Sequence, residues 1–312
     1  MKSVVTIGTF DGVHRGHQVL LSKVAAKSDE LGVQAVVVTF EPVPISVLRP
    51  EHYRGRIYPA EDKLRLLGMP GIDQIEVVPF TRELAAKSPE EFIGELIDKL
   101  GMIELWVGDD FALGRNRTGN VEVIRELGIT MGYKTVAVER IATDGHPVSS
   151  TAIRKAIETG DVSLAASLLG RPFRISGEVI HGAHLGRKIG YPTANFVPPP
   201  GLVQLADGIY ASYAMIPPDQ QPLPAMTYVG TRPTVDGEDR HIETNIFDFE
   251  GDLYGQVLTI DLIERVRADQ TFDGLEPLIA QLRKDEEAIR SILRVTPHTE
   301  LASAAEAGDN HY

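Results

Sequence analysis

Two histidines near the start of the chain, His14 and His17, flank a dipeptide that contains Gly16. The β-branched run Val4–Ile7 precedes them, and helical spacing of apolar residues begins at about Gln18, so they lie where a strand gives way to a helix. A helix N-terminus offers an anion free backbone N–H groups and the positive end of the helix dipole. Imidazoles donate to phosphate oxygens without a permanent charge. The pattern predicts a polyphosphate-binding turn.

Two other interpretations of this turn stay open. Its histidines can simply cap backbone groups, or they can bind a metal ion, although no set of carboxylates or cysteines follows at ligand spacing. Gly8, Phe10 and Asp11 extend the pattern to Gly-x-Phe-Asp-Gly-x-His-x-Gly-His. This longer string is far more specific than the histidine pair alone.

Strand and helix patterns alternate around this turn and continue to about residue 160. Such an order predicts an α/β domain, with a parallel sheet that is covered by helices on both faces. Residues 88–91, Ser-Pro-Glu-Glu, carry the signature of a capping box at the start of a further helix. We expect strands at Ser3–Ile7, Ala35–Phe40, Ile75–Pro79, Ile103–Val107 and Thr135–Val138, and helices at Ala60–Leu67 and Val121–Leu127.

Further polar or glycine-rich clusters follow two of the predicted strands. Residues 40–42, Phe-Glu-Pro, follow the second strand, and residues 108–115, which include Asp110, follow the strand that ends at Val107. Each cluster alone also fits an ordinary turn or a solvated charge. Because parallel strands end at one edge of a sheet, where ligands bind, the clusters together favour a binding site there.

A third cluster, Ser149–Arg154, begins a helix. Ser150 and Thr151 can cap this helix or contact phosphate, and Arg154 projects one turn later from the same end. With the clusters described above, it predicts a nucleotide site.

Composition excludes several classes of protein. The 312 residues carry 31 basic and 44 acidic side chains, a net charge of −13, so we expect no nucleic-acid partner. The absence of cysteine excludes disulfides, thiolate metal sites and a cysteine nucleophile. No apolar run approaches the ~18 residues that span a membrane. The chain starts directly with a strand pattern and shows no leader, so we expect a soluble, cytoplasmic protein.

Helical spacing stops near Pro172, and an all-β pattern follows. We therefore expect a first domain over 1–172, a second over 173–295 and a disordered tail over 296–312. Short strands separated by Pro/Gly-rich turns predict a small six-stranded β-barrel, with an amphipathic helix at Leu275–Leu293 packed against it. We expect its strands within Ser176–His181, Gly208–Ile216, Ala225–Val229, His241–Phe249 and Gln256–Val266.

A glycine-punctuated loop in this second domain, residues 182–195, contains Arg187 and Lys188. Such a loop can close over a polyphosphate, while Thr193 and Asn195 offer oxygen ligands to Mg²⁺. Taken alone, the loop also fits an ordinary surface connection.

In motifs and in their order, residues 3–294 resemble the prokaryotic bifunctional riboflavin kinase/FAD synthetase family. In the first half, the resemblance rests on the histidine string and on Ser-Ser-Thr-Ala-Ile-Arg at 149–154. It implies a Rossmann-like nucleotidyltransferase domain that transfers AMP from ATP to FMN and releases pyrophosphate. His14, His17 and Arg154 would stabilise charge on the phosphates. The implied ATP contacts are Gly8, Phe10, Asp11, Gly16, Asp110, Ser150 and Thr151.

In the second half, the loop at 182–195 is similar to the flavokinase module of the same family, and residues 228–234, 243–249 and 252–255 continue the match in order. The resemblance implies Mg-ATP-dependent phosphorylation of riboflavin to FMN. Glu243 would be the general base that deprotonates the ribityl 5′-hydroxyl. Thr193 and Asn195 would bind Mg²⁺, and Arg267 and Phe272 would help bind the flavin. The implied ATP contacts are Gly182, Gly186, Arg187, Gly190, Pro192, Thr193 and Asn195.

Two positions depart from the family pattern. Val43 and Asn245 each stand where the family commonly has histidine, so the first lacks a phosphate donor and the second carries no charge. We expect both activities, with ATP, riboflavin, FMN and FAD as ligands. The alternatives are a paralogue with one activity or with a modified flavin as substrate, another nucleotidyltransferase such as a cytidylyltransferase, and a non-catalytic flavin-binding protein.

Overall fold

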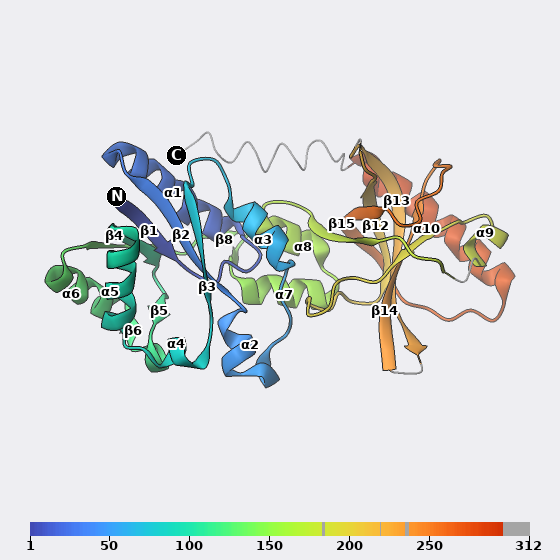
Figure 1. The fold of residues 1–312 in the computed structure, drawn as a ribbon. Helices are drawn as coiled ribbons and strands as arrows, with labels where there is room; N and C mark the ends of the chain where they lie inside the picture. Colours follow the sequence, from blue (N-terminus) through green and yellow to red (C-terminus); the bar gives the residue numbers. More distant parts are fainter. Residues whose placement is uncertain (183–184, 219, 235–236, 296–312) are drawn as a thin grey trace. The chain divides into compact units, whose positions relative to one another are not determined.

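The chain folds into two compact units, Met1–Ser150 and Thr151–Tyr312, in a computed structural model. The structure describes residues 1–182, 185–218, 220–234 and 237–295. Each unit is built around a sheet of its own (Figure 1). The tail at 296–312, which we expect to be disordered, lies outside the described residues.

A five-stranded parallel sheet forms the centre of the first unit, as the alternating pattern predicts. The strand order is β3-β2-β1-β4-β7, so the chain moves outward on one side of β1 and then resumes on its other side with β4. This reversal is a topological switch point, and ligands in such sheets bind just beyond the carboxyl ends of the strands there. The strands are β1 (Ser3–Ile7), β2 (Gln34–Glu41), β3 (Gln74–Pro79), β4 (Met102–Gly108) and β7 (Lys134–Val138).

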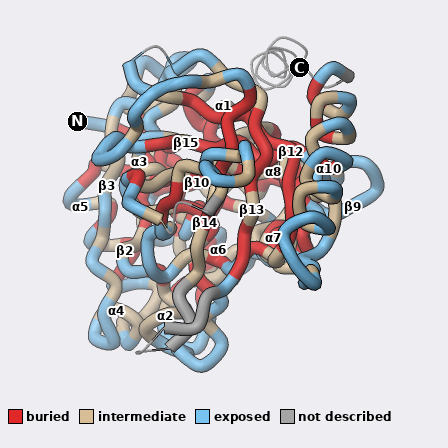
Figure 2. Tube along the Cα trace, turned by 90° about the vertical axis from the view of Figure 1, so that its right-hand side faces the viewer, coloured by how far each residue is buried: buried red, intermediate tan, exposed pale blue. Residues whose placement is uncertain are grey.

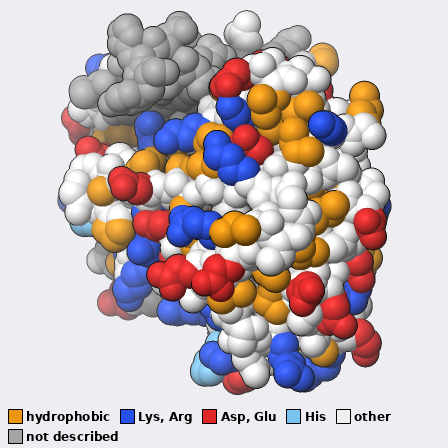
Figure 3. Space-filling view, turned by 90° about the vertical axis from the view of Figure 1, so that its left-hand side faces the viewer, with side chains coloured by type: hydrophobic (Ala, Val, Ile, Leu, Met, Phe, Trp, Pro, Cys, Tyr) orange, Lys and Arg blue, Asp and Glu red, His pale blue; other side chains and the backbone are white. Residues whose placement is uncertain are grey.

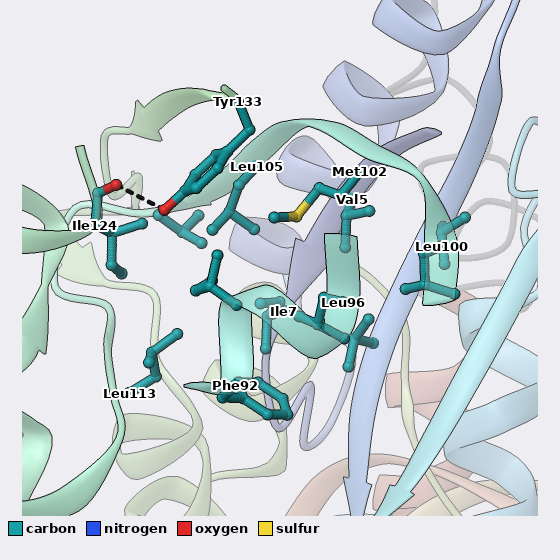
Figure 4. Close-up of a cluster of buried hydrophobic side chains, with 14 residues drawn as sticks. Val5, Ile7, Phe92, Leu96, Leu100, Met102, Leu105, Leu113, Ile124 and Tyr133 are labelled. Carbon is teal, nitrogen blue, oxygen red and sulfur yellow. Dashed lines mark hydrogen bonds between the residues drawn. The ribbon is translucent and has the colours of Figure 1, made fainter. Parts of the chain in front are cut away.

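Both faces of this sheet are covered by helices. On one face pack α1 (Arg15–Leu31) and α3 (Ala60–Leu67), and on the other face α5 (Pro89–Leu100) and α6 (Val121–Met131). The short helices α2 (Pro44–Leu48) and α4 (Arg82–Ala86) contain no buried residue. Because neighbouring side chains of a strand point to opposite faces, Val5 and Val4 of β1 enter different cores. Val5 lies with Ile124 of α6, whose carbonyl accepts a 2.7 Å hydrogen bond from Tyr133 (Figure 4). Val4 lies with Leu21 of α1 in the other core.

The predicted start is confirmed for one helix, whereas a second helix begins earlier than predicted. In α5, Ser88 Oγ accepts from the N–H of Glu91, and the Glu91 carboxylate accepts from the N–H of Ser88, as a capping box requires. In α1, His14 occupies the N-cap position, so the helix starts at Arg15 and not near Gln18. The short elements are β5 (Ala112–Leu113), β6 (Gly119–Asn120), β8 (Ala142–Thr143), β9 (His146–Pro147) and the 3₁₀ turns η1 (Pro50–His52) and η2 (Arg115–Arg117).

The second unit contains a curled antiparallel sheet of six strands, which confirms the predicted all-β architecture. Its order is β10-β15-β12-β13-β14-β11. Within the described residues, a bridge between Ile180 and Asn195 joins the segment after β10 to β11 and so brings the two sheet edges together. The strands are β10 (Phe173–Glu178), β11 (Ala194–Phe196), β12 (Gly208–Met215), β13 (Pro222–Thr234), β14 (Gly237–Ile246) and β15 (Val257–Ala268).

The last helix of the second unit, α10 (Leu275–Val295), packs on this sheet as predicted. Ile289 and Leu293 are buried in a cluster with Ile209 and Tyr213 of β12, and the Tyr213 hydroxyl donates to the carbonyl of Leu293 at 2.9 Å. Figure 2 shows buried residues along the strands and exposed residues on the outer side of α10. The other helices are α7 (Ser150–Thr159), which begins at the division between the units, α8 (Val162–Leu169) and α9 (Leu185–Lys188).

The surface agrees with the acidic composition. Basic and acidic side chains are intermixed over the face that Figure 3 shows. Among the helices that the structure describes, none combines the length and the apolar character needed to cross a membrane.

Candidate functional site

The first candidate site is the loop between β1 and α1, at the switch point of the parallel sheet. His14 is 6% exposed, and its Nδ1 accepts a hydrogen bond from the N–H of His17 at 3.3 Å. An imidazole that accepts at Nδ1 carries its proton at Nε2 when it is neutral, and an Nε2–H group is a donor for an anion. The predicted capping role and the predicted donor role are therefore compatible, because they use different nitrogens.

The two imidazoles are stacked at the start of α1. Their ring centroids lie 3.5 Å apart with an interplanar angle of 15°, and Phe10 meets His17 edge-on at 5.1 Å. A Cβ at Gly16 would lie 3.3 Å from the His14 ring, so glycine leaves room for the stack.

Most of the other residues predicted for this site support the loop itself. Phe10 is 1% exposed and packs in the core beside Gly8, while Asp11 is 4% exposed. The Asp11 carboxylate accepts from the N–H of Ile57 at 3.0 Å, and the Asp11 carbonyl accepts from the Ser150 hydroxyl at 2.8 Å. Asp11 and Ser150 thus fix the loop against two distant segments.

The remaining predicted residues lie after β4 and in α7. Asp110 is exposed and shares Arg140 with Asp109, at 3.6 and 2.9 Å respectively. Thr151 and Arg154 lie in the first turns of α7, beyond the division between the units, so their approach to the histidines stays a prediction. Val43, one of the two departures, is 4% exposed and stands at the N-cap of α2.

The second candidate site is a pocket in the second unit. Six of its lining residues are among those predicted for the kinase ATP site, whereas Gly190 is not part of the lining. Sequence reasoning missed Tyr254, whose ring lies 3.8 Å from that of His181 between centroids, at an interplanar angle of 34°. Its only signal was its place in the matched string at 252–255. The lining residues are Gly182, Gly186, Arg187, Pro192, Thr193, Asn195 and Tyr254.

Strand register places Glu243 beside this pocket. Asn195 of β11 is the direct partner of Glu243 in β14, and the Thr193 hydroxyl donates to the Glu243 carboxylate at 3.4 Å. The Asn195 amide donates to the Thr193 hydroxyl at 3.1 Å. A Cβ at Gly182 would lie 2.7 Å from that amide, so this position requires glycine.

These side chains form a donor set that fits Mg²⁺. A hydroxyl, an amide and a carboxylate supply hard oxygen atoms, which Mg²⁺ prefers, and this ion commonly takes few protein ligands together with water and phosphate oxygens. The described residues contain no group of three or more His, Cys, Asp or Glu that could hold a metal ion. Thr193 and Asn195 therefore suit a metal ion that arrives with a nucleotide.

Residues around the pocket hold its loop in place. Asn245, the second departure, donates its amide to the carbonyl of Pro192 at 2.7 Å. The Tyr191 hydroxyl donates to Glu286 of α10 at 3.1 Å; burial and this hydrogen bond raise the pKa of Tyr191. The departure at Asn245 thus retains a structural role through its donor N–H.

Tyr228, the cross-strand partner of Glu243, is a second side chain to consider as a base. Burial, followed by the charge and the hydrogen bond of Asp269, raises the pKa of Tyr228 to about 12. The phenol therefore stays protonated near neutral pH, and the carboxylate of Glu243 is the better proton acceptor.

Arg267, predicted to bind the flavin, is held by a buried acid. Its guanidinium donates to both oxygens of Asp285, at 2.8–3.1 Å, and Asp285 is 2% exposed. The ring of Phe272 lies 5.7 Å from the guanidinium carbon. Arg267 thus joins β15 to α10 and orders the segment that carries Phe272.

Comparisons with known proteins cover both units. The family model for FAD synthetase matches residues 1–152, and the model for riboflavin kinase matches residues 169–293. The chain is 39% identical to the bifunctional riboflavin kinase/FMN adenylyltransferase of Pseudomonas fluorescens, over 95% of this chain and 94% of that protein. It is 38% identical to the protein of the same name from Escherichia coli K12, over 94% and 93% of the two chains.

Among solved structures, a crystal structure described as a macrolide-efflux protein from Streptococcus pneumoniae is similar over nearly the whole chain. It has a TM-score of 0.85 and 33% identity, and the match covers 93% of this chain and 94% of that one. The curated relatives and both family models agree with the resemblance that the sequence motifs indicate. The chain belongs to the family of bifunctional riboflavin kinase/FMN adenylyltransferases.

Proposed function

We propose that the chain makes FAD from riboflavin in two consecutive steps, each of which uses ATP and each of which takes place in its own unit. The observation that carries the proposal is the Thr193–Glu243 contact in the wall of a glycine-lined pocket. It brings a candidate base next to candidate metal and phosphate ligands. Membership of the family supports the same pair of reactions.

In the kinase step, Glu243 accepts the proton of the ribityl 5′-hydroxyl of riboflavin. The oxygen then attacks the γ-phosphorus of ATP, the bond to the bridging oxygen breaks, and ADP and FMN are released. Arg187 and the backbone around Gly182 and Gly186 bind phosphate oxygens. Mg²⁺, held by Thr193 and Asn195 when bound, would neutralise charge on the transferred phosphoryl group.

In the adenylyl-transfer step, a phosphate oxygen of FMN attacks the α-phosphorus of ATP, and pyrophosphate leaves. The histidines donate to the phosphates through their side-chain N–H groups, and the start of α1 adds the positive end of the helix dipole. Arg154 adds a permanent positive charge, a role that rests on the resemblance. No covalent intermediate is required, which agrees with a chain that has no cysteine.

The domain boundary and the location in the cell also form part of the proposal. We keep the boundary near Pro172, although α8 contacts the barrel through a 3.2 Å hydrogen bond from Ser163 to Ile263. We also keep a cytoplasmic location, in agreement with a chain that lacks cysteine.

The decisive experiment incubates the chain with riboflavin, ATP and Mg²⁺ and resolves the flavins by chromatography. FAD as the product is expected. FMN alone would mean that the first unit is inactive, and an unconverted flavin that copurifies with a yellow protein would favour a flavin carrier. Failure with riboflavin but turnover of a modified flavin would identify a paralogue with another substrate.

A further inference from the structure

A lysine is buried at the carboxyl end of β2, beside the first candidate site. Lys63 of α3 is 3% exposed, and its Nζ lies 2.6 Å from the Glu41 carboxylate, at the last residue of β2. The ammonium group also donates to the carbonyl of Phe40 at 3.1 Å and to the hydroxyl of Thr39 at 3.3 Å. The ammonium group thus has one ion pair and two hydrogen bonds, and a buried charge needs such partners.

The first connection from this lysine to the histidine loop passes through Thr39. The Thr39 hydroxyl accepts from Lys63 and donates to the carbonyl of Thr9 at 3.3 Å. Thr9 lies two residues beyond the end of β1, in the loop that leads to His14. Lys63 therefore fixes the orientation of a hydroxyl that holds the entry to this loop.

The second connection passes through Glu41. Its other carboxylate oxygen accepts from Arg56 at 3.1 Å, and the next residue, Ile57, donates its N–H to the Asp11 carboxylate at 3.0 Å. Burial lowers the pKa of Arg56, but hydrogen bonds and charge from Tyr53 and Glu41 outweigh it and raise the pKa overall. The charged pair thus also fixes the segment that holds the middle of the loop.

The buried Lys63–Glu41 pair can be compared with an exposed ion pair in the same unit. Lys99 and Glu76 make an ion pair of the same 2.6 Å length, but the Lys99 side chain is 61% exposed, and its hydrogen bond goes to Glu76 of β3 and not to the histidine loop. Exposed pairs contribute little, and buried pairs are often no more stabilising than apolar side chains of the same volume. Stability alone therefore gives little reason for a buried Lys63–Glu41 pair, whereas the geometry of the loop gives one.

We propose that Lys63 and Glu41 are positioning residues for adenylyl transfer: they hold the loop from Thr9 to His14 in the geometry in which the histidines meet the phosphates. The proposal rests on the FMN adenylylation proposed above and adds residues that act through others. It predicts that loss of the pair lowers kcat for FAD formation more than it changes KM, because the groups affected stabilise charge in the transition state.

The test uses Lys63→Met, Glu41→Gln and the double variant in the full chain, with Lys63→Arg as the conservative variant and Lys99→Met as the matched control. FMN-to-FAD conversion gives kcat and KM, and riboflavin-to-FMN conversion by the same molecules is the internal reference. Trp106, the single tryptophan, lies in β4, so its fluorescence reports the folding of the first unit.

For Lys63→Met, kcat for FAD formation is expected to fall by about ten- to a hundredfold, because small misplacements of catalytic groups have effects of this size. Riboflavin phosphorylation should stay within about twofold, and Lys63→Arg should recover most of the lost kcat. In the double variant neither charge of the buried Lys63–Glu41 pair remains, and Arg56 keeps its hydrogen bond with Tyr53, so the melting temperature should recover while kcat stays low. A kcat that recovers together with the melting temperature would overturn the proposal, as would an unchanged kcat in Lys63→Met.

Thr39→Val keeps the proposal testable if Lys63→Met does not fold. This substitution preserves the shape of the side chain and removes only the hydroxyl between Lys63 and Thr9. A several-fold loss of kcat with normal tryptophan fluorescence supports the proposal, and a normal kcat contradicts it. A wild-type chain that forms FMN but no FAD would instead refute the adenylylation step itself, and the positioning role with it.

Discussion

The two candidate sites position their chemistry in different ways. In the first unit, the histidines lie on a loop at the start of α1. The Thr39 hydroxyl of β2 and the backbone N–H of Ile57 hold that loop, and Lys63 of α3 in turn contacts Thr39 and Glu41. In the second unit, Asn195 and Glu243 are neighbours on adjacent strands, and backbone pairing sets their separation. A site on a loop depends on distant side chains, whereas a site on a sheet depends on register.

This difference has consequences for what each site tolerates. A strand pair corrects small disturbances, because each ladder hydrogen bond restrains its neighbours. A loop has no such ladder. Loss of a side-chain contact that supports the loop therefore displaces the functional groups on the loop. We therefore expect substitutions in the second site to act through the altered group itself, and substitutions around the first site to act at a distance.

The largest effect is expected for Glu243→Gln. Loss of a general base lowers the rate by about 10²–10⁴-fold, so riboflavin phosphorylation should nearly cease while FMN-to-FAD conversion stays unchanged. Separate assays from riboflavin and from FMN measure the two steps. Loss of both activities would contradict two independent sites.

The second-largest effect is expected for a double variant at the histidine loop of the first unit. His17→Ala combined with Arg154→Ala removes two groups that stabilise charge, each of which contributes about 10²-fold or more in comparable sites. Riboflavin should then be converted to FMN but no further, so FMN should accumulate, which chromatography of the reaction mixture detects. Continued synthesis of FAD by this variant would refute the site assignment in the first unit.

Two glycines allow a matched comparison between the sites. Gly182→Ala places a methyl group 2.7 Å from the Asn195 amide, and Gly16→Ala places one 3.3 Å from the His14 ring. Overpacking costs about 1–3 kcal/mol, so Gly182→Ala, with the closer contact, should lower kinase kcat/KM by about thirtyfold, and Gly16→Ala should lower FAD formation by about tenfold. A larger loss at Gly16 would mean that close approach of phosphate, and not room for the imidazole, is what requires glycine there.

Much of this fold follows from local patterns in the sequence. The β-branched run of β1 and the capping box at Ser88 depend on neighbours within a few residues, and both are found where they were predicted. The start of α1 was placed three residues too late, because His14 serves as an N-cap and histidine is not among the usual N-cap residues. The three-residue strand β11 was missed, because so short a segment shows no alternation.

The parts of the sites that escaped prediction depend on contacts between residues far apart in the chain. Lys63 lies in an ordinary amphipathic helix, and nothing in the residues around it indicates that it pairs with Glu41 across 22 positions. Likewise, Arg267 was assigned to the flavin, but its partner Asp285 lies on another element. Sequence motifs name the groups that carry out the chemistry, whereas the groups that hold them become visible only in the folded chain.

The smallest effect is expected for substitution of Asn245, a position where this chain departs from the family pattern. Asn245→Ala removes the amide that donates to Pro192, and a hydrogen bond of this kind contributes about 1 kcal/mol, or about a fivefold change. Because Pro192 lines the pocket and precedes Thr193, the loss should raise KM for ATP in the kinase reaction and leave kcat for FAD formation unchanged. Asn245→Asp, which also lacks the donor N–H, should behave alike, whereas Asn245→Gln should retain part of the function. If KM does not change in either variant, backbone pairing alone holds the pocket, and the contrast between a sheet site and a loop site is sharper than the contacts of Asn245 suggest.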